Sequence, residues 1–243
     1  MMRNLKAVER VFYWVFNLAV VSYLALQAWP TLLFPYSYKY GNLLIATSEP
    51  VDHQHLQTLV TSVLGASSGN VLPLADETYE VFIHDSHLLY RLFVPLGSSS
   101  FGFYNAIFRK VHINKADIIS NRAFSQKRPN DGRPLHELIL HETCHQSLQS
   151  RLGFLKAFLL EEWQREGLCE YVAKGSSIVK ETDIEDFLAR REPLHSSAKY
   201  LQYRSYVSFL IEKQGLDVMG VIRSSKSESQ IDEDIRLWLE QNG

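Results

Sequence analysis

The feature that most restricts the fold of this chain is a segment without charge, from Val11 to Pro35. Roughly 20 mainly apolar residues are enough for a helix to cross a bilayer. Aromatic residues lie near the ends of the segment, and such rings favour the headgroup region of a membrane. They are Tyr13, Trp14, Trp29 and Tyr36. We therefore expect residues 1–36 to form a short charged region followed by a transmembrane signal anchor.

The charges around this segment predict its orientation. Arg3, Lys6 and Arg10 precede it, whereas only Lys39 follows closely. Because basic residues are retained on the cytoplasmic side, the N-terminus is predicted to be cytoplasmic. The chain would be a single-pass membrane protein with the lipid bilayer as a partner. Residues 37–243 would form its domain, on the periplasmic or extracellular side.

Two other interpretations of the segment remain open at this point. It could be a cleaved signal peptide, but it is long for one, and the Ala-Leu-Gln-Ala at 25–28 is a poor cleavage site. It could also be a buried helix of a water-soluble domain. The length, 243 residues, suits one catalytic domain with a short appendage. The net charge is −2 and no block of like charges occurs, so we expect no nucleic-acid partner.

The rest of the chain predicts an α+β fold, with a small N-terminal sheet followed by a mainly helical half. Residues 36–49 are expected to form a connector, and a helix over 51–65 is expected to end at Gly65. Strands are predicted at 78–84 and 107–118, a helix at 87–93, a loop at 95–102, and later helices at 133–153, 159–174, 182–191, 197–214 and 228–241. The helix over 133–153 has a proline at its start and a glycine at its end, the expected asymmetry. Strands first and helices afterwards are typical of α+β domains.

An H-E-x-x-H element, His141 to His145, lies inside that first long helix. With 3.6 residues per turn, His141 and His145 project from the same face of the helix. Neutral imidazole is a preferred zinc ligand. Glu142 lies about 100° around the helix, where its carboxylate can reach a zinc-bound water as a general base. The element therefore predicts one Zn²⁺ per chain, with His141 and His145 as ligands and Glu142 as a catalytic residue.

A second element follows about twenty residues later, where Trp163 and Glu166-Gly167 precede Tyr171. H-E-x-x-H followed by W-x-x-E-G-x-x-x-Y resembles the gluzincin metallopeptidases, including small peptidase MA-like proteins. The resemblance covers roughly residues 100–225 and is strongest over 136–173. It implies a zincin-like fold, with Glu166 as the third zinc ligand and Glu170 as an outer carboxylate that orients a ligating histidine. Glu161, Glu162 and Glu170 compete with Glu166 for the ligand position. The alternative for Glu166 and Glu170 is that both belong to a solvated, charged face of the helix.

The resemblance also implies two parts of the site that the motif does not contain. Related peptidases stabilise the oxyanion with a later Tyr or His, and the candidates here are His195, Tyr200, Tyr203 and Tyr206. We select Tyr203, although aromatic residues at this spacing are commonly core residues. The resemblance further places the edge strand that aligns the substrate within residues 101–114.

Two cysteines flank the predicted ligands. Cys144 lies next to His145, and Cys169 follows Glu166, so the helices that unite the ligands could also unite the sulfurs. Outside the cytoplasm these two residues could form a disulfide, the alternative being two buried thiols. The remaining candidates for metal binding are weaker. We expect His84, His87 and His112 to be surface residues or hydrogen-bonded core residues.

The sequence thus predicts a membrane-anchored zinc metallopeptidase that hydrolyses protein or peptide substrates. One alternative is a zinc hydrolase of a non-protein amide, which would need the same ligands. Another is a catalytically idle binding module, although such a protein would not need Glu142. The G-x-M-E-N element of aminopeptidases is missing, so aminopeptidase activity is not expected.

Overall fold

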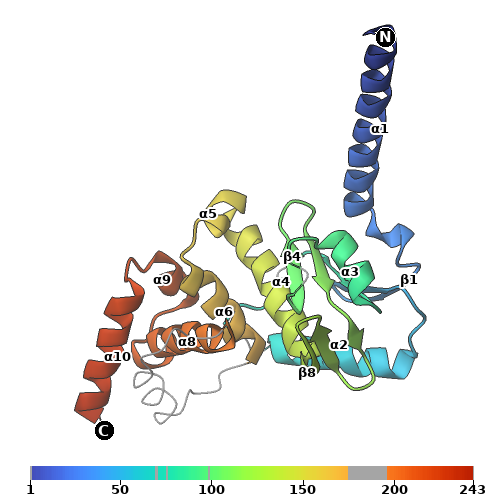
Figure 1. Cartoon of the computed structure of the whole chain (residues 1–243). Helices are drawn as coiled ribbons and strands as arrows, with labels where there is room; N and C mark the ends of the chain where they lie inside the picture. The colour runs from blue at the N-terminus through green and yellow to red at the C-terminus, as the bar shows by residue number, and fades with distance from the viewer. Residues whose placement is uncertain (1, 69–70, 75, 98, 175–195, 243) are drawn as a thin grey trace.

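The chain has a mixed α+β architecture, as predicted. The computed structural model describes residues 2–68, 71–74, 76–97, 99–174 and 196–242 (Figure 1). A long N-terminal helix leads into a sheet region, and a helical half follows. The predicted helix at 182–191 lies outside the described residues. The helices are α1 (Met2–Ala28), η1 (Pro30–Leu32), α2 (His53–Ser68), α3 (His87–Phe93), α4 (Leu135–Leu152), α5 (Phe154–Phe158), α6 (Glu162–Lys174), α8 (Ser196–Ser208), the π-helical η2 (Phe209–Lys213), α9 (Val218–Arg223) and α10 (Glu228–Asn242).

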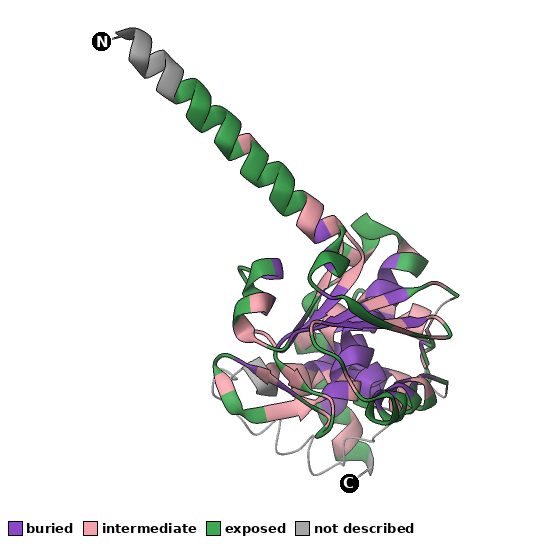
Figure 2. Cartoon of the chain, turned by 90° about the vertical axis from the view of Figure 1, so that its right-hand side faces the viewer, coloured by how far each residue is buried: buried purple, intermediate pink, exposed green. Residues whose placement is uncertain are grey.

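Helix α1 projects away from the folded domain (Figure 2). Its segment Glu9–Ala28 is long and apolar enough to cross a membrane. Only 6% of the most apolar part of this segment is buried, so α1 is not a core helix of the domain. Its C-terminal end is attached, because Gln27 donates hydrogen bonds to the carbonyl oxygens of Leu92 and Phe93.

The main sheet has five strands in the order β1-β2-β3-β5-β4. They are β1 (Tyr36–Tyr40), β2 (Leu43–Thr47), β3 (Tyr79–Ile83), β5 (Lys110–Ile113) and β4 (Gly102–Asn105). Strands β2, β3 and β5 are parallel, whereas the edge strands β1 and β4 are antiparallel to their neighbours. The prediction of a connector over 36–49 is therefore wrong. Gly41, with φ +58°, and Asn42 join β1 to β2, and Gly-Asn between two strand-like runs is a hairpin signal.

The two faces of the sheet are covered by different helices. Alternate side chains of a strand point to opposite faces. In β3, Tyr79, Val81 and Ile83 accordingly face α2 and α4, whereas Phe82 faces α3 and Phe34. This alternation places α4 directly on the sheet, with β4 as the neighbouring edge strand.

Several local predictions need correction. Helix α2 continues through Gly65 to Ser68, so Gly65 does not end it. The single strand expected over 107–118 is two strands, β5 and β6 (Ala116–Asp117), and a turn occupies its first residues. Strands β6, β7 (Arg122–Ser125) and β8 (Arg128–Pro134) form an additional antiparallel sheet that the sequence did not indicate. In contrast, α4 begins after Pro134 and ends at Gly153, as the proline-glycine asymmetry predicted.

Two fully buried histidines lie on the α3 face of the sheet. The rings of His84 and His112 are 5.4 Å apart and are surrounded by Phe34, Phe82 and Phe93. The Nδ1 atom of His84 lies 2.6 Å from the carbonyl oxygen of Ile113. Among the described residues, neither ring nitrogen of His112 has a hydrogen-bond partner, so this histidine is not the hydrogen-bonded core residue we expected.

We expect this histidine pair to destabilise the protein in mild acid. Burial lowers the pKa of His84 to about 4, and burial also places the pKa of His112 well below 6.5. At these two histidines the unfolded chain therefore binds more protons than the folded chain between pH 6.5 and 4, and their contribution to the free energy of unfolding falls as the pH drops through this range. The loss for His84 is roughly 3 kcal/mol. Urea unfolding in detergent at several pH values measures it.

A matched pair of variants isolates this effect. His112→Phe keeps an aromatic ring against Phe93 and removes one titrating group. The free energy of unfolding of this variant should therefore change less with pH than that of the unmodified protein. His55→Gln changes a histidine whose side chain is 45% exposed and should leave the slope unchanged. Equal slopes in both variants would contradict the assignment.

Candidate metal centre

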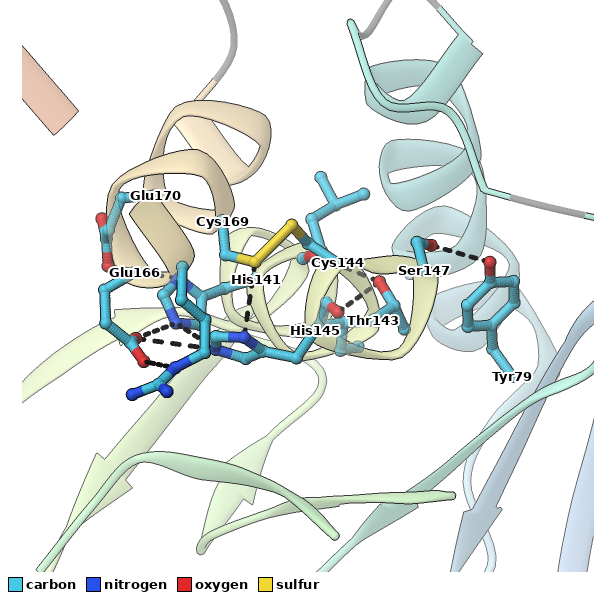
Figure 3. Close-up of a disulfide and its surroundings, with 12 residues drawn as sticks. Tyr79, His141, Thr143, Cys144, His145, Ser147, Glu166, Cys169 and Glu170 are labelled. Atoms are coloured by element: carbon cyan, nitrogen blue, oxygen red, sulfur yellow. Dashed lines mark hydrogen bonds and ion pairs between the residues drawn. A yellow bond between two sulfur atoms is a disulfide. The ribbon is translucent and has the colours of Figure 1, made fainter. Parts of the chain in front are cut away.

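Two helices bring three potential metal ligands together (Figure 3). His141 and His145 lie one turn apart on α4, and their Nε2 atoms are 3.3 Å from each other. Glu166, on α6, places its Oε2 atom 3.4 Å from Nε2 of His141 and 3.6 Å from Nε2 of His145. Among the described residues, these three form the group of side chains that could hold a metal ion.

The geometry of this group fits a small divalent cation. Zinc binds imidazole nitrogen and carboxylate oxygen at about 2.0–2.2 Å, so two ligand atoms at corners of a tetrahedron lie roughly 3.3–3.6 Å apart. The three observed separations fall in this range. Two imidazole nitrogens and a carboxylate oxygen that face one point make a good cation site. With three protein ligands, a fourth position would remain for water.

Glu170 supports the first of these histidines from behind. Its Oε1 atom lies 3.5 Å from Nδ1 of His141 and accepts a hydrogen bond of 2.7 Å from Arg133. The side chain of Glu170 is only 1% exposed, and Lys174 pairs with its other oxygen. Burial raises the pKa of Glu170, but the charges of His141, Arg133 and Lys174 outweigh burial and lower the pKa to about 2. An ionised Glu170 favours a proton on Nδ1 of His141 and leaves Nε2 free to bind metal.

The competing acids of α6 are placed elsewhere. Glu162 pairs with Lys199 at 2.6 Å and is half exposed. Glu166 alone has one oxygen directed to both imidazoles, and its second oxygen, Oε1, accepts a hydrogen bond from Arg165. Burial by itself raises the pKa of Glu166, but interactions with His145 and His141 outweigh it, and the net shift is strongly downward. Glu166 is thus an ionised carboxylate ready for a cation.

Glu142 is buried beside the two histidines. It is 6% exposed and lies against Gly102, the first residue of the edge strand β4, where a Cβ atom would be 2.8 Å from its Oε1 atom. Burial raises the pKa of Glu142, and the neighbouring histidines oppose that shift only in part. A raised pKa suits a group that takes up a proton and gives it back near neutral pH.

A disulfide joins the helices that carry the ligands. Cys144 of α4 and Cys169 of α6 are bonded, with their Cα atoms 5.3 Å apart, a usual separation for a disulfide. The Sγ atom of Cys169 also lies 3.5 Å from Nδ1 of His145. The disulfide therefore fixes α6 against α4 close to the ligands (Figure 3). Cys144 is next to His145, and Cys169 is three residues after Glu166.

The structure does not place Tyr203 at this site. The Tyr203 hydroxyl lies 3.2 Å from a carboxylate oxygen of Glu228 and 3.4 Å from one of Glu162, and the side chain belongs to the core of the helical half. Tyr200 of α8 faces the site, with its ring centre 6.2 Å from that of His141. Burial, together with the charges of Glu166, Glu142 and Glu170, raises the pKa of Tyr200. Tyr203 lies three residues on, nearly one full turn, and the packing of α8 decides which tyrosine reaches the ligands.

Of the two other candidates for this role, the structure describes Tyr206. Tyr206 donates a hydrogen bond of 2.7 Å to Asp232 of α10, away from the ligands. His195 lies outside the described residues. The predicted edge strand within 101–114 is confirmed as a strand at the edge of the sheet, but only β4 (Gly102–Asn105) forms the edge, and β5 pairs with β3 behind it.

Gly167 allows α6 to bring Glu166 into place. A Cβ atom at position 167 would lie 2.4 Å from the backbone oxygen of Tyr203 on α8, so the two helices cross at this glycine. We expect Gly167→Ala to lower the free energy of unfolding by about 1–3 kcal/mol, because backbone atoms cannot move aside cheaply. Chemical denaturation measures this change. Gly65→Ala is the control: Gly65 is also helical, has open space around it, and should be neutral or slightly stabilising on substitution.

Three contributors to the site were not predicted from the sequence. Arg133 binds the oxygen of Glu170 that faces His141, Arg165 binds the oxygen of Glu166 that faces away from the histidines, and Gly102 makes room for Glu142. Arg165 had a usable signal, because it precedes the proposed ligand directly. Arg133 and Gly102 are distant in sequence from their partners, so no local pattern could have identified them.

No protein-family model matches the chain, and no curated protein matches it in sequence.

Proposed function

We propose that this chain is a membrane-anchored zinc-dependent metallopeptidase with a zincin-like catalytic domain. The observation that carries the proposal is the convergence of His141 Nε2, His145 Nε2 and Glu166 Oε2 within 3.6 Å of one another, beside a buried glutamate. Zinc bound there would polarise a substrate carbonyl and make a bound water acidic.

The residues of the chain would divide the remaining work. Glu142 takes a proton from the attacking water and passes it to the leaving amine, as a buried carboxylate with a raised pKa can. Glu170 and Arg165 hold His141 and Glu166 in position. In place of Tyr203, Tyr200 is our candidate for stabilising the oxyanion, because it is the aromatic residue of α8 beside His141.

A peptide is the substrate that the surroundings of the site favour. Strand β4 is an edge strand, and its first residue touches Glu142. An extended peptide can add to such an edge and present successive backbone carbonyls along it. A peptide added beside β4 would therefore pass the metal ligands of α4.

The anchor is supported by the character of α1. This helix is apolar, exposed and attached to the domain through Gln27, which lies within the Ala-Leu-Gln-Ala sequence at 25–28. Because Gln27 contacts α3, cleavage after this sequence would remove a contact of the folded domain. This favours an uncleaved anchor, with the cytoplasmic N-terminus that the basic residues predict.

The proposal is tested by metal-dependent cleavage of peptides. The full chain, purified in detergent and loaded with zinc, should cleave members of a random peptide mixture internally, and a chelator should abolish cleavage until zinc is restored. Mass spectrometry of the products identifies the cut bonds. Tight binding of one zinc ion with no cleavage of any peptide would contradict the peptidase. It would leave the hydrolase of another amide, or the binding module, as the explanation of the site.

A further inference from the structure

The exposed apolar side chains of the domain are gathered in three segments. After α1, sixteen large apolar residues are exposed among the described residues, and twelve of them lie within 29–33, 88–107 and 154–159. Leu155 of α5 is 69% exposed, Ile107 in the turn between β4 and β5 is 78% exposed, and Leu88 of α3 is 79% exposed. Single exposed apolar residues are normal, whereas such a concentration marks an interaction surface.

Hydrogen bonds join the end of α1 to α3 and β4, and the end of α4 to the β4–β5 turn. Gln27, at the end of α1, donates to the carbonyl oxygens of Leu92 and Phe93 at the end of α3, and its own Oε1 atom accepts from Asn105 at the end of β4. Gln149, near the end of α4, donates to the carbonyl oxygen of Ala106.

Helix α5 follows α4 directly. Figure 1 accordingly shows α5, the β4–β5 turn, α3 and the base of α1 at the same end of the domain. We call this end the apical face.

The apical face is also basic. Residues 29–33, 88–107 and 154–159 contain Arg91 and Lys156 and no aspartate or glutamate. A surface with exposed apolar residues and basic side chains is suited to a bilayer interface, where the apolar residues enter the headgroup region and the basic residues meet anionic lipids.

We propose that the apical face docks on the surface of the same bilayer that α1 crosses. The proposal depends on α1 spanning a membrane. Lipid is favoured over a second copy of the chain because the face is continuous with the apolar helix. Exposed Trp29 and Leu32 follow α1 immediately, and aromatic residues favour the headgroup region of a membrane. The domain would then lie flat on the membrane through α3, α5 and the β4–β5 turn.

Docking would place the metal centre at a small height above the lipid. Gly102 touches Glu142, whereas Asn105 contacts the base of α1, and the two residues are three positions apart on β4. At about 3.3 Å per residue the strand between them covers roughly 10 Å. If the proposed peptidase function holds, its substrates are chain segments that emerge from the bilayer within about this distance.

Fluorescent probes measure whether the face enters the lipid. A cysteine is introduced by Leu155→Cys, Ile107→Cys or, as control, Ile119→Cys, and each is labelled with NBD in the full chain. The native cysteines are bonded to each other and do not react. Ile119 is 72% exposed, which matches Leu155, but it lies outside the three segments. Each labelled chain is placed as a single copy in a phosphatidylcholine–phosphatidylglycerol nanodisc, with or without nitroxide-bearing lipid.

We expect the nitroxide to quench the probes at 155 and 107 several-fold more than the probe at 119. Equal quenching at all three positions would overturn the proposal, and a single copy per disc removes dimerisation as a source of protection. Zinc binding verifies that each labelled variant is folded. Peptide cleavage is measured on the same discs: quenching without cleavage counts against the peptidase and leaves the docked face, whereas cleavage with equal quenching refutes docking alone.

Discussion

Glu142→Gln is expected to lower the turnover of a peptide substrate about 100- to 10,000-fold while the chain still binds one zinc ion. The reason is that glutamine keeps the size of the side chain but cannot accept and return a proton. Glu142 is buried against Gly102, so a change of size would disturb the edge strand, and the isosteric amide avoids this. Turnover is measured on the peptides that the unmodified protein cleaves, and bound zinc is measured by metal analysis.

Glu137→Gln is the matched control for this experiment. Glu137 lies in the first turn of the same helix, four residues before His141, and does not belong to the His141, His145 and Glu166 group. The same chemical change there should leave turnover within a factor of a few. Comparable activity in the Glu142→Gln variant and the unmodified chain, with zinc bound in both, would show that this glutamate is not the general base. It would also remove the main support for hydrolysis.

Glu166→Gln is expected to weaken zinc binding more than about 100-fold, since loss of an outer carboxylate already costs 10- to 100-fold. Removing the carboxylate charge leaves two neutral imidazoles as the remaining ligands. The environment of Glu166 is built for an anion, with Arg165 on one oxygen and both histidines on the other. Competition with a chromophoric chelator gives the affinity, and the zinc-induced rise in melting temperature should shrink accordingly.

Two other glutamates of α6 calibrate this result. Glu162→Gln changes an exposed residue one turn earlier that pairs with Lys199, and it should leave zinc affinity unchanged. Glu170→Gln should have an intermediate effect of about 10- to 100-fold, because it acts through His141. If Glu166→Gln bound zinc as well as Glu162→Gln, the ligand set would be wrong.

The sequence by itself determined the features that depend on neighbours along the chain. The spacing of His141 and His145 places both imidazoles on one face of any helix, and proline and glycine at its ends predicted the bounds of α4 closely. The composition of residues 11–35 predicted a helix able to cross a membrane, and the structure has a helix of that length and apolarity at Glu9–Ala28, which ends seven residues earlier than predicted. Helix α3 matched its predicted bounds, with Ser86 accepting a hydrogen bond from Leu89 at its start.

Tertiary structure decided what depends on contacts between distant segments. Four glutamates competed for the third ligand position, and only the crossing of α6 on α8 at Gly167 and the pairing of Cys144 with Cys169 turn Glu166 to the histidines. The choice of Tyr200 over Tyr203 depends on which face of α8 packs inward. Rotating a helix by one residue, or leaving a strand such as β2 unpaired, changes the interactions between neighbours along the chain very little. Burial against neighbours that are remote in sequence selects among these arrangements, and a local pattern does not contain that information.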